Sequence, residues 1–274
     1  MVKKVDEHSR NDAFCEKTST SIWQETPSTT NPYTVSEARC HGYEHLALIN
    51  NRSYTEVLFL MFQGELPTPE QHQLFEHLLT SLIHPGPRHN ACRAAMNAAV
   101  SKTHVSHILP LSLNVLSGEQ GGSHEVFQAM KYLQNNQQVT PRMGAQALTQ
   151  AAKILVAQTD EGDIIPAPGF GTFYGSIDNY TQKIADNVFN HCSPGPHLRW
   201  AHAMLDGIDE ELTLSWRIAG LAGACLLDLG FTPYTGELIF QIACAPGIAA
   251  QAAEKSNSPI TEMPFLAEEN YVIK

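Results

Sequence analysis

Apolar residues recur at helical spacing along almost the whole chain, and this periodicity constrains the fold more than any other feature. Leu74, Leu78 and Leu82, for example, return every four residues and therefore share one face of a helix. No run of alternating β-branched residues, the pattern of a half-buried strand, competes with this spacing. The sequence therefore predicts an all-α fold.

Capping residues and turns mark where the helices begin and end. Thr68 is an N-cap, Pro69 fills the first helical position, and Gln71 completes a capping box. Gly64 supplies the left-handed residue that ends the preceding helix. Small residues in the segment 91–100 favour close packing against a neighbouring helix. Further helices are predicted over 104–116, 123–134, 142–158, 179–190, 210–229 and 235–255.

The first 34 residues are polar and lack sustained periodicity. We expect them to form an arm that lies on a partner subunit. The segment 2–7 is not followed by the apolar core of a signal peptide, and no apolar run reaches the roughly 18 residues that span a bilayer. The expected location is therefore the cytoplasm, without a membrane segment.

Charge and cysteine content exclude further classes of function. The 274 residues are 43% apolar and 16% charged, enough to bury a large core, and the formal net charge of −11 repels nucleic acid. The six cysteines include no CxxC pair, which indicates reduced, mostly buried thiols. His104 and His107 lack an identifiable third ligand, so no metal site is expected.

Four segments carry motifs that go beyond helical periodicity, and a Gly-Glu-Leu-Pro turn at 64–67 accompanies them. They are 117–125 (SGEQGGSHE), 168–178 (PGFGTFYGSID), 217–231 (RIAGLAGACLLDLGF) and 244–254 (CAPGIAAQAAE). In this order they resemble the citrate synthase superfamily, in particular its short citryl-CoA lyase and ATP-citrate-lyase-type members. The resemblance extends from about Ile22 to the C-terminus.

The resemblance implies that three catalytic positions of the family are substituted in this chain. The family's first catalytic His, in a Gly-Pro-Leu-His-Gly-Gly stretch, is similar in position to Gln120. Its second His, in Pro-Gly-Phe-Gly-His, corresponds to Thr172, and the enolising Asp of Asn-Val-Asp-Gly corresponds to Ala219. A glutamine amide still donates a hydrogen bond, but none of these three side chains transfers a proton at neutral pH.

The same resemblance implies the ligand-binding positions and the domain organisation. A large helical domain is expected over 35–124 and 235–274, and a small one over 125–234, with the ligand cleft between the domains of an intimate homodimer. No tightly bound cofactor is implied; CoA or acyl-CoA would be a substrate or ligand. Cys244 replaces an Arg that grips a carboxylate in the family, and Gln251 replaces a His. The implied ligand-binding residues are Gly121, Gly122, Gly169, Phe170, Gly171, Tyr174, Cys244 and Gln251.

Three hypotheses for function follow. In the first, the chain is a non-catalytic or regulatory homologue that binds acyl-CoA or a carboxylate. In the second, it is an active acyl-CoA carbon–carbon synthase or lyase with relocated catalytic residues. In the third, it is a partner of an intact paralogue in a mixed oligomer. His124 and Asp178 are the candidate replacement residues. Plainer interpretations exist as well: His124 lies near a helix start, Asp178 suits an N-cap, and Tyr174 suits a packing role in its loop. His202 and Asp206 are spaced as a pair on a solvated helix face.

Overall fold

The computed structural model describes residues 14–158, 162–209 and 212–272. Helices dominate these ranges, which confirms the all-α prediction. The chain divides after Glu65 into two compact units. Within the described ranges no helix is both long and apolar enough to cross a membrane.

The first unit contains a small sheet that the sequence analysis did not predict. Strand β1 (Trp23–Pro27) pairs antiparallel with β2 (Val35–Cys40), which pairs in turn with β3 (Tyr43–Glu44). Most of the sheet is exposed, so the alternating apolar pattern of a half-buried strand is missing. The predicted arm is therefore partly a strand, while residues 1–13 lie outside the described ranges.

Two short helices complete the first unit. Helix α1 (His45–Asn51) follows β3, and α2 (Tyr54–Gln63) begins with a capping box formed by Ser53 and Glu56. Helix α2 ends at Gly64, whose φ of 81° is the left-handed conformation that glycine adopts without strain. The predicted end of this helix is confirmed.

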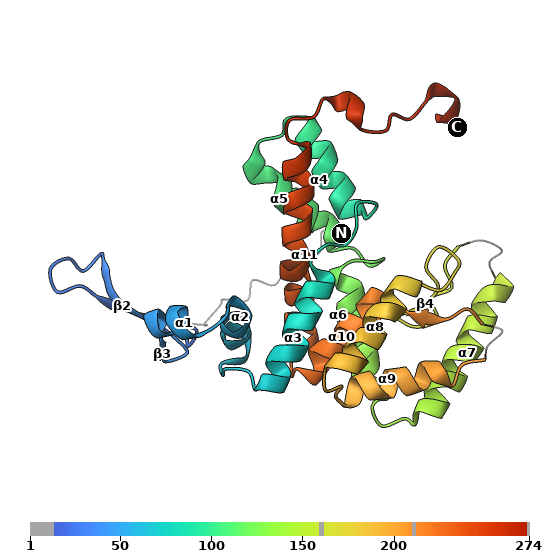
Figure 1. Ribbon diagram of the computed structural model, residues 1–274, viewed down its shortest axis with the longest axis horizontal. Helices are drawn as coiled ribbons and strands as arrows, with labels where there is room; N and C mark the ends of the chain where they lie inside the picture. The colour runs from blue at the N-terminus through green and yellow to red at the C-terminus, as the bar shows by residue number, and fades with distance from the viewer. Residues whose placement is uncertain (1–13, 159–161, 210–211, 273–274) are drawn as a thin grey trace, which may run out of the picture. The chain divides into compact units, whose positions relative to one another are not determined.

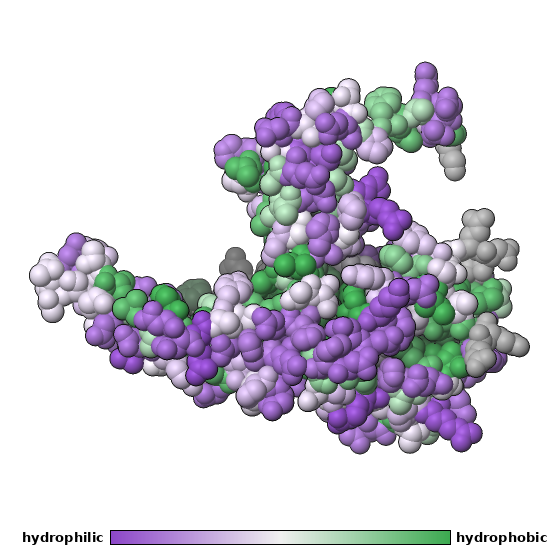
Figure 2. All heavy atoms as spheres, viewed as in Figure 1, coloured by the Kyte–Doolittle hydropathy of each residue, from purple (hydrophilic) through white to green (hydrophobic). Residues whose placement is uncertain are grey.

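The second unit is a helical bundle (Figure 1). Its first helix, α3, begins with the predicted capping box of Thr68 and Gln71. Figure 2 shows mainly hydrophilic residues over the visible face of α3 and α9. The helices of this unit are α3 (Pro69–Leu82), α4 (Asn90–Val100), α5 (Val105–Leu116), α6 (Ser123–Asn136), α7 (Pro141–Gln158), α8 (Asn179–His191), α9 (Pro196–Asp206), α10 (Ile218–Asp228) and α11 (Pro233–Lys255). Two single-turn 3₁₀ helices, Ile260–Glu262 and Glu268–Asn270, follow α11.

Helix α10 lies at the centre of the bundle, where it packs on α6 and α9 and also contacts α3, α8 and α11. Its residues from Ala219 to Leu227 are all buried. A helix that is apolar on every side must be covered on every side, and small residues let its neighbours approach closely. The small residues of α4 serve the same purpose, since α4 packs against α5 and α11.

The helix predicted over 210–229 is shorter than expected. Residues Ser215–Trp216 form strand β5, which pairs antiparallel with β4 (Phe170–Gly171), so α10 starts only at Ile218. The Trp216 side chain is fully buried and packs on Phe170, with 5.3 Å between ring centroids. This long-range pairing overrides the local helical pattern, and it brings the glycine-rich segment to the start of α10.

Candidate functional site

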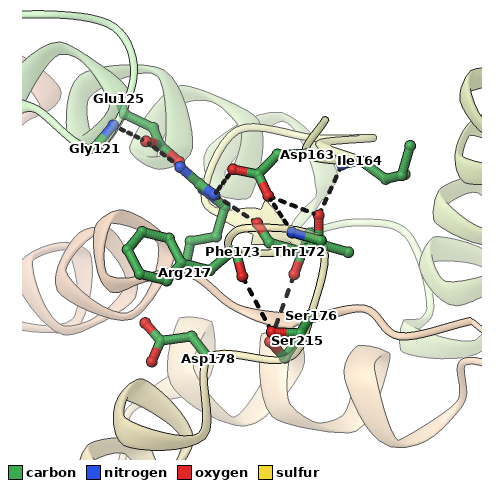
Figure 3. Close-up of polar contacts among 12 residues, drawn as sticks. Gly121, Glu125, Asp163, Ile164, Thr172, Phe173, Ser176, Asp178, Ser215 and Arg217 are labelled. Atoms are coloured by element: carbon green, nitrogen blue, oxygen red, sulfur yellow. Dashed lines mark hydrogen bonds and ion pairs between the residues drawn. The ribbon is translucent and has the colours of Figure 1, made fainter. Parts of the chain in front are cut away.

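Three segments that are distant in sequence meet beside the start of α10 (Figure 3). They are the α5–α6 turn (residues 117–122), the glycine loop (residues 163–178) and the α10 start (residues 217–220). Each contains one of the three substituted positions predicted from the sequence. The residues that join the segments are Glu125, Asp163, Thr172 and Arg217, called here the Arg217 cluster.

A buried ion pair lies at the centre of the Arg217 cluster. Arg217 Nε donates to Glu125 Oε1 at 2.7 Å, and Nη2 donates to Glu125 Oε2 at 3.3 Å. The two side chains are only 7% and 4% exposed. Glu125 Oε2 also accepts a hydrogen bond from the Gly121 backbone at 2.6 Å. The pair therefore fixes the α5–α6 turn against the α10 start.

The remaining guanidinium nitrogen of Arg217 reaches the glycine loop. Nη1 donates to the Thr172 carbonyl oxygen at 2.6 Å and lies 3.8 Å from Asp163 Oδ2. Asp163 Oδ1 accepts from the Thr172 hydroxyl at 3.1 Å and from the Gly175 backbone at 2.9 Å. One cation thus faces two carboxylates, and Asp163 closes the glycine loop on itself.

Two glycines allow the glycine loop to touch the α10 start directly. Gly169 has a φ of +81°, and the Arg217 backbone N–H donates to the Gly169 carbonyl oxygen at 3.0 Å. A Cβ on Gly220 would overlap the Gly169 carbonyl group, and a Cβ on Gly169 would overlap the backbone of Gly220. Backbone packs on backbone here because neither residue has a side chain.

The three positions predicted to be substituted differ in their exposure to solvent. Gln120 is exposed in the α5–α6 turn. Thr172 is buried, and its hydroxyl is engaged in the loop, donating to Asp163 and accepting from the Ile164 backbone at 2.8 Å. The methyl group of Ala219 is buried in the first turn of α10, where the residue is 1% exposed. Of the three residues, only Gln120 is exposed to solvent.

The two candidate replacement residues have different environments. His124 is half-buried, and its Nδ1 lies 3.5 Å from Glu237 Oε1 on α11. Asp178 caps α8, accepting from the backbones of Tyr180 and Thr181 at 3.1 Å each and from the Thr181 hydroxyl at 2.5 Å. In Figure 3 the Asp178 side chain takes no part in the network around Arg217. The N-cap interpretation of Asp178 agrees with this geometry.

Most of the predicted ligand-binding residues in the α5–α6 turn and the glycine loop are buried or adopt backbone conformations that the turn and the loop require. Gly121 is left-handed, with a φ of +70°, and a Cβ on Gly122 would overlap the Gly118 and Leu116 carbonyl oxygens. Gly171 and Phe170 are buried in the β4–β5 pairing. Tyr174 is exposed, with a φ of 51°. Their contact with a ligand stays a prediction.

Cys244 and Gln251 lie seven residues apart on α11. Cys244 is fully buried, and this burial raises the pKa of its thiol to about 12. Gln251 Oε1 lies 3.3 Å from His84 Nε2. A neutral, buried thiol cannot replace the charged grip of an arginine on a carboxylate.

A histidine-rich segment that the sequence analysis did not single out connects α11 with the α5–α6 turn. The Gly247 backbone donates to the Ile83 carbonyl oxygen at 2.9 Å, and His84 follows directly. His89 Nε2 lies 3.0 Å from the Gly121 carbonyl oxygen, while Nδ1 of the same ring accepts from the Ala91 backbone and caps α4. His89 therefore contacts the α5–α6 turn directly, whereas His84 contacts Gln251 on α11.

Arg217 and Asp163 were also missed. A signal for Arg217 exists, since a cation directly before a wholly apolar helix needs a buried partner. Asp163 has no comparable signal, because it lies in an ordinary polar stretch. Among the described residues no group of His, Cys, Asp or Glu has the arrangement of a metal site.

A surface hollow of about 690 Å³ lies between α7 and α9, away from the three segments. Lys153 and Asp209 pair at its edge, with 3.6 Å between Nζ and Oδ2. The pair His202 and Asp206, at 3.7 Å, is on the partly solvated face of α9, as predicted for a surface pair. Neither feature contacts the Arg217 cluster.

Comparison with solved structures relates this arrangement to known proteins. Citryl-CoA lyase from Hydrogenobacter thermophilus is 22% identical, with a TM-score of 0.73 over 94% of each chain. ATP citrate lyase from Methanothrix soehngenii is 13% identical, with a TM-score of 0.67 over 96% of this chain but only 44% of its own. Citrate synthase from Thermotoga maritima is 16% identical, with a TM-score of 0.61 over 81% of this chain and 58% of its own.

No family model matches the sequence, and no curated protein matches it either. At these identities the likeness concerns the fold, which is also what the sequence resemblance predicted. The chain thus has the helical fold that citryl-CoA lyase, ATP citrate lyase and citrate synthase share.

Proposed function

We propose that this chain binds an acyl-CoA or a small di- or tricarboxylate and that it has lost the carbon–carbon synthase or lyase reaction. Such a protein would act as a regulatory or partner subunit. The observation that carries the proposal is the chemistry of the three substituted positions. Gln120, Thr172 and Ala219 present an amide, an engaged hydroxyl and a methyl group.

Condensation with an acyl-CoA needs a carboxylate or comparable base for the methyl proton, and donors for the developing oxyanions. Each such group contributes about a hundredfold to a ten-thousandfold in rate. Ala219 is buried and has no ionisable group, and the nearby Glu125 carboxylate is occupied by Arg217 and the Gly121 backbone. Neither residue is therefore available as the base that turnover requires.

Retention of a ligand is supported by the geometry of the α5–α6 turn. Gln120 is exposed, and its amide can donate a neutral hydrogen bond to a carbonyl oxygen. Arg88 is an exposed cation that directly precedes His89, and His89 Nε2 lies 3.0 Å from the Gly121 carbonyl oxygen, so the chain carries a basic group beside this turn in spite of the net charge of −11. An anionic ligand needs this local positive charge.

Isothermal titration with acetyl-CoA, CoA, oxaloacetate and citrate tests the proposal, with thiol release and citrate cleavage assayed on the same samples. We expect saturable binding of at least one of these ligands without turnover. Gln120→Ala should weaken that binding, whereas Lys153→Gln, on the distant α7–α9 hollow, should leave it unchanged. Steady turnover of any acyl-CoA with a keto acid at ordinary enzyme rates would refute the proposal.

A second candidate function is an active acyl-CoA synthase or lyase with a relocated base, favoured by the His124–Glu237 pair. A carboxylate that orients an imidazole is a common arrangement in acid–base catalysis. If this candidate is right, His124→Gln abolishes turnover, Glu237→Gln reduces it, and His202→Gln, which alters the comparable pair on α9, leaves it intact.

The oligomeric state is also a proposal. We propose a homodimer, with association to an intact paralogue as the alternative. Analytical ultracentrifugation of the purified chain, followed by co-expression with such a paralogue, separates the two. A stable homodimer that does not associate with the paralogue would support the homodimer proposal.

A further inference from the structure

We infer that the Glu125–Arg217 pair is a positioning element that orders the α5–α6 turn and the glycine loop as one cooperative unit. Neither side chain contacts a ligand in this role; both act through the loops that they hold. The consequence for ligand binding rests on the proposed function, whereas the coupling between the loops does not.

Hydrogen bonds engage both charged groups of the pair. All three guanidinium nitrogens of Arg217 are engaged, two by Glu125 and one by the glycine loop. Both Glu125 oxygens are engaged as well, and one of them also holds the Gly121 amide. Removing one member of a buried pair leaves the other charged and desolvated, so partial disruption is disfavoured. The two loops therefore open together or not at all.

The pair lies close to all three substituted positions. Gln120 directly precedes Gly121, and the Gly121 amide donates to Glu125. The Thr172 carbonyl oxygen accepts a hydrogen bond from Arg217. Ala219 follows Arg217 by two residues. The pair thus hydrogen-bonds to the backbone beside Gln120 and at Thr172, and Arg217 lies two residues before Ala219. A shift of either side chain displaces the surroundings of all three, although they are distant in sequence.

Two carboxylates balance the charge of Arg217. Arg217 faces Glu125 within hydrogen-bond distance and Asp163 at 3.8 Å. When Glu125 is neutralised, Asp163 becomes the nearest anion to Arg217, and this draws the guanidinium toward the glycine loop. Glu125→Gln therefore changes both loops even though it preserves shape.

Hydrogen exchange followed by mass spectrometry tests the coupling. In Glu125→Gln, peptides covering 117–122 and 163–178 should both exchange about tenfold to a hundredfold faster, the ratio expected for loss of a charge-assisted hydrogen bond. Asp228→Asn removes charge from another buried carboxylate, on the far end of α10, and is the matched control. It should deprotect the start of α9 and leave both loops unchanged.

Two further measurements keep the inference falsifiable if Glu125→Gln does not fold. Arg217→Lys retains the charge but loses the bidentate fork, and it should deprotect the same two loops. In the wild type, the slowest amides of the two loops should share one dependence on low concentrations of urea. Faster exchange in one loop alone, or different urea dependences, would overturn the coupling.

Titration then links the coupling to ligand binding. Any of the four ligands that binds the wild type should bind Glu125→Gln at least about tenfold more weakly, because loss of an outer residue that orients a site commonly lowers affinity by this factor. The same ligand should bind Asp228→Asn with unchanged affinity. Equal weakening in both variants would indicate general destabilisation and contradict the positioning role. If the wild type binds none of the four, the proposed function fails, while hydrogen exchange still decides the coupling.

Discussion

The Asp228 carboxylate, at the end of α10, caps the start of α9 at His197. Oδ1 accepts from the His197 backbone at 2.8 Å and lies 2.9 Å from His197 Nδ1, while Oδ2 accepts from the Leu198 backbone at 3.0 Å. The Asp228 side chain is only 1% exposed. A Cβ on Gly195 would overlap this carboxylate, so the glycine makes room for it. The first helical amides of α9, which lack partners within their own helix, are thus satisfied by a different helix.

Asp228→Ala should lower the free energy of unfolding by about 2–4 kcal/mol, because it leaves buried donors without an acceptor. Asp206→Ala, at the exposed end of α9, is the control and should change stability by less than about 0.5 kcal/mol. Urea denaturation followed by circular dichroism measures both. Equal effects of the two substitutions would contradict the capping role.

The contact between Gly169 and Gly220 leads to a second prediction. Gly220→Ala should lower the free energy of unfolding by about 2–3 kcal/mol, because overpacking displaces the glycine loop from α10. Gly118→Ala is the matched control, since its Cβ would meet only the Val115 carbonyl oxygen at an ordinary 3.6 Å. Thermal unfolding compares the two, and near-wild-type stability of Gly220→Ala would contradict direct backbone packing.

Buried thiols predict a loss of stability at alkaline pH. Burial raises the pKa of Cys92 to about 11 and that of Cys244 to about 12, compared with 9.0 for an exposed thiol. The folded state therefore keeps protons that the unfolded state releases. The resulting stability is fully present below pH 9 and is lost as the pH rises toward 11 to 12.

Equilibrium unfolding between pH 8 and 10.5 measures this dependence. Cys244→Ala should reduce the slope of the free energy of unfolding against pH above pH 9, because one titrating group is removed. Cys15→Ala, which removes an exposed thiol, is the control. An unchanged slope in Cys244→Ala would mean that the thiol titrates in the folded protein as it does in the unfolded chain.

Local sequence patterns predicted most of the helices but not the strands. The capping box at Thr68 and the helix end at Gly64 are confirmed, because both depend on residues within one turn. Strand β5 escaped prediction because its partner, Phe170–Gly171, lies more than forty residues away. The apolar residues after 210 therefore looked like the beginning of a helix.

The candidate site was predictable only in part for a similar reason. Motifs located the three segments, and the structure brings them together beside α10. The residues that join them, Glu125 and Arg217, are separated by 92 positions and interact through buried charges. No local pattern encodes such a pair, and the role of Asp163 depends on the fold of its own loop.

The burial of Ala219 leads to the last prediction, which concerns the restoration of chemistry. Ala219→Asp introduces a carboxylate at a position that is 1% exposed. Burial of an uncompensated carboxylate should lower the free energy of unfolding by about 3 kcal/mol or more, and it should yield no thiol release from acetyl-CoA with oxaloacetate. Ala147→Asp, on the exposed face of α7, is the control and should cost less than about 1 kcal/mol, the helix-propensity difference. A stable Ala219→Asp variant that gains turnover would mean instead that the α10 start opens to the substrate, so that a single side chain separates this protein from an active enzyme.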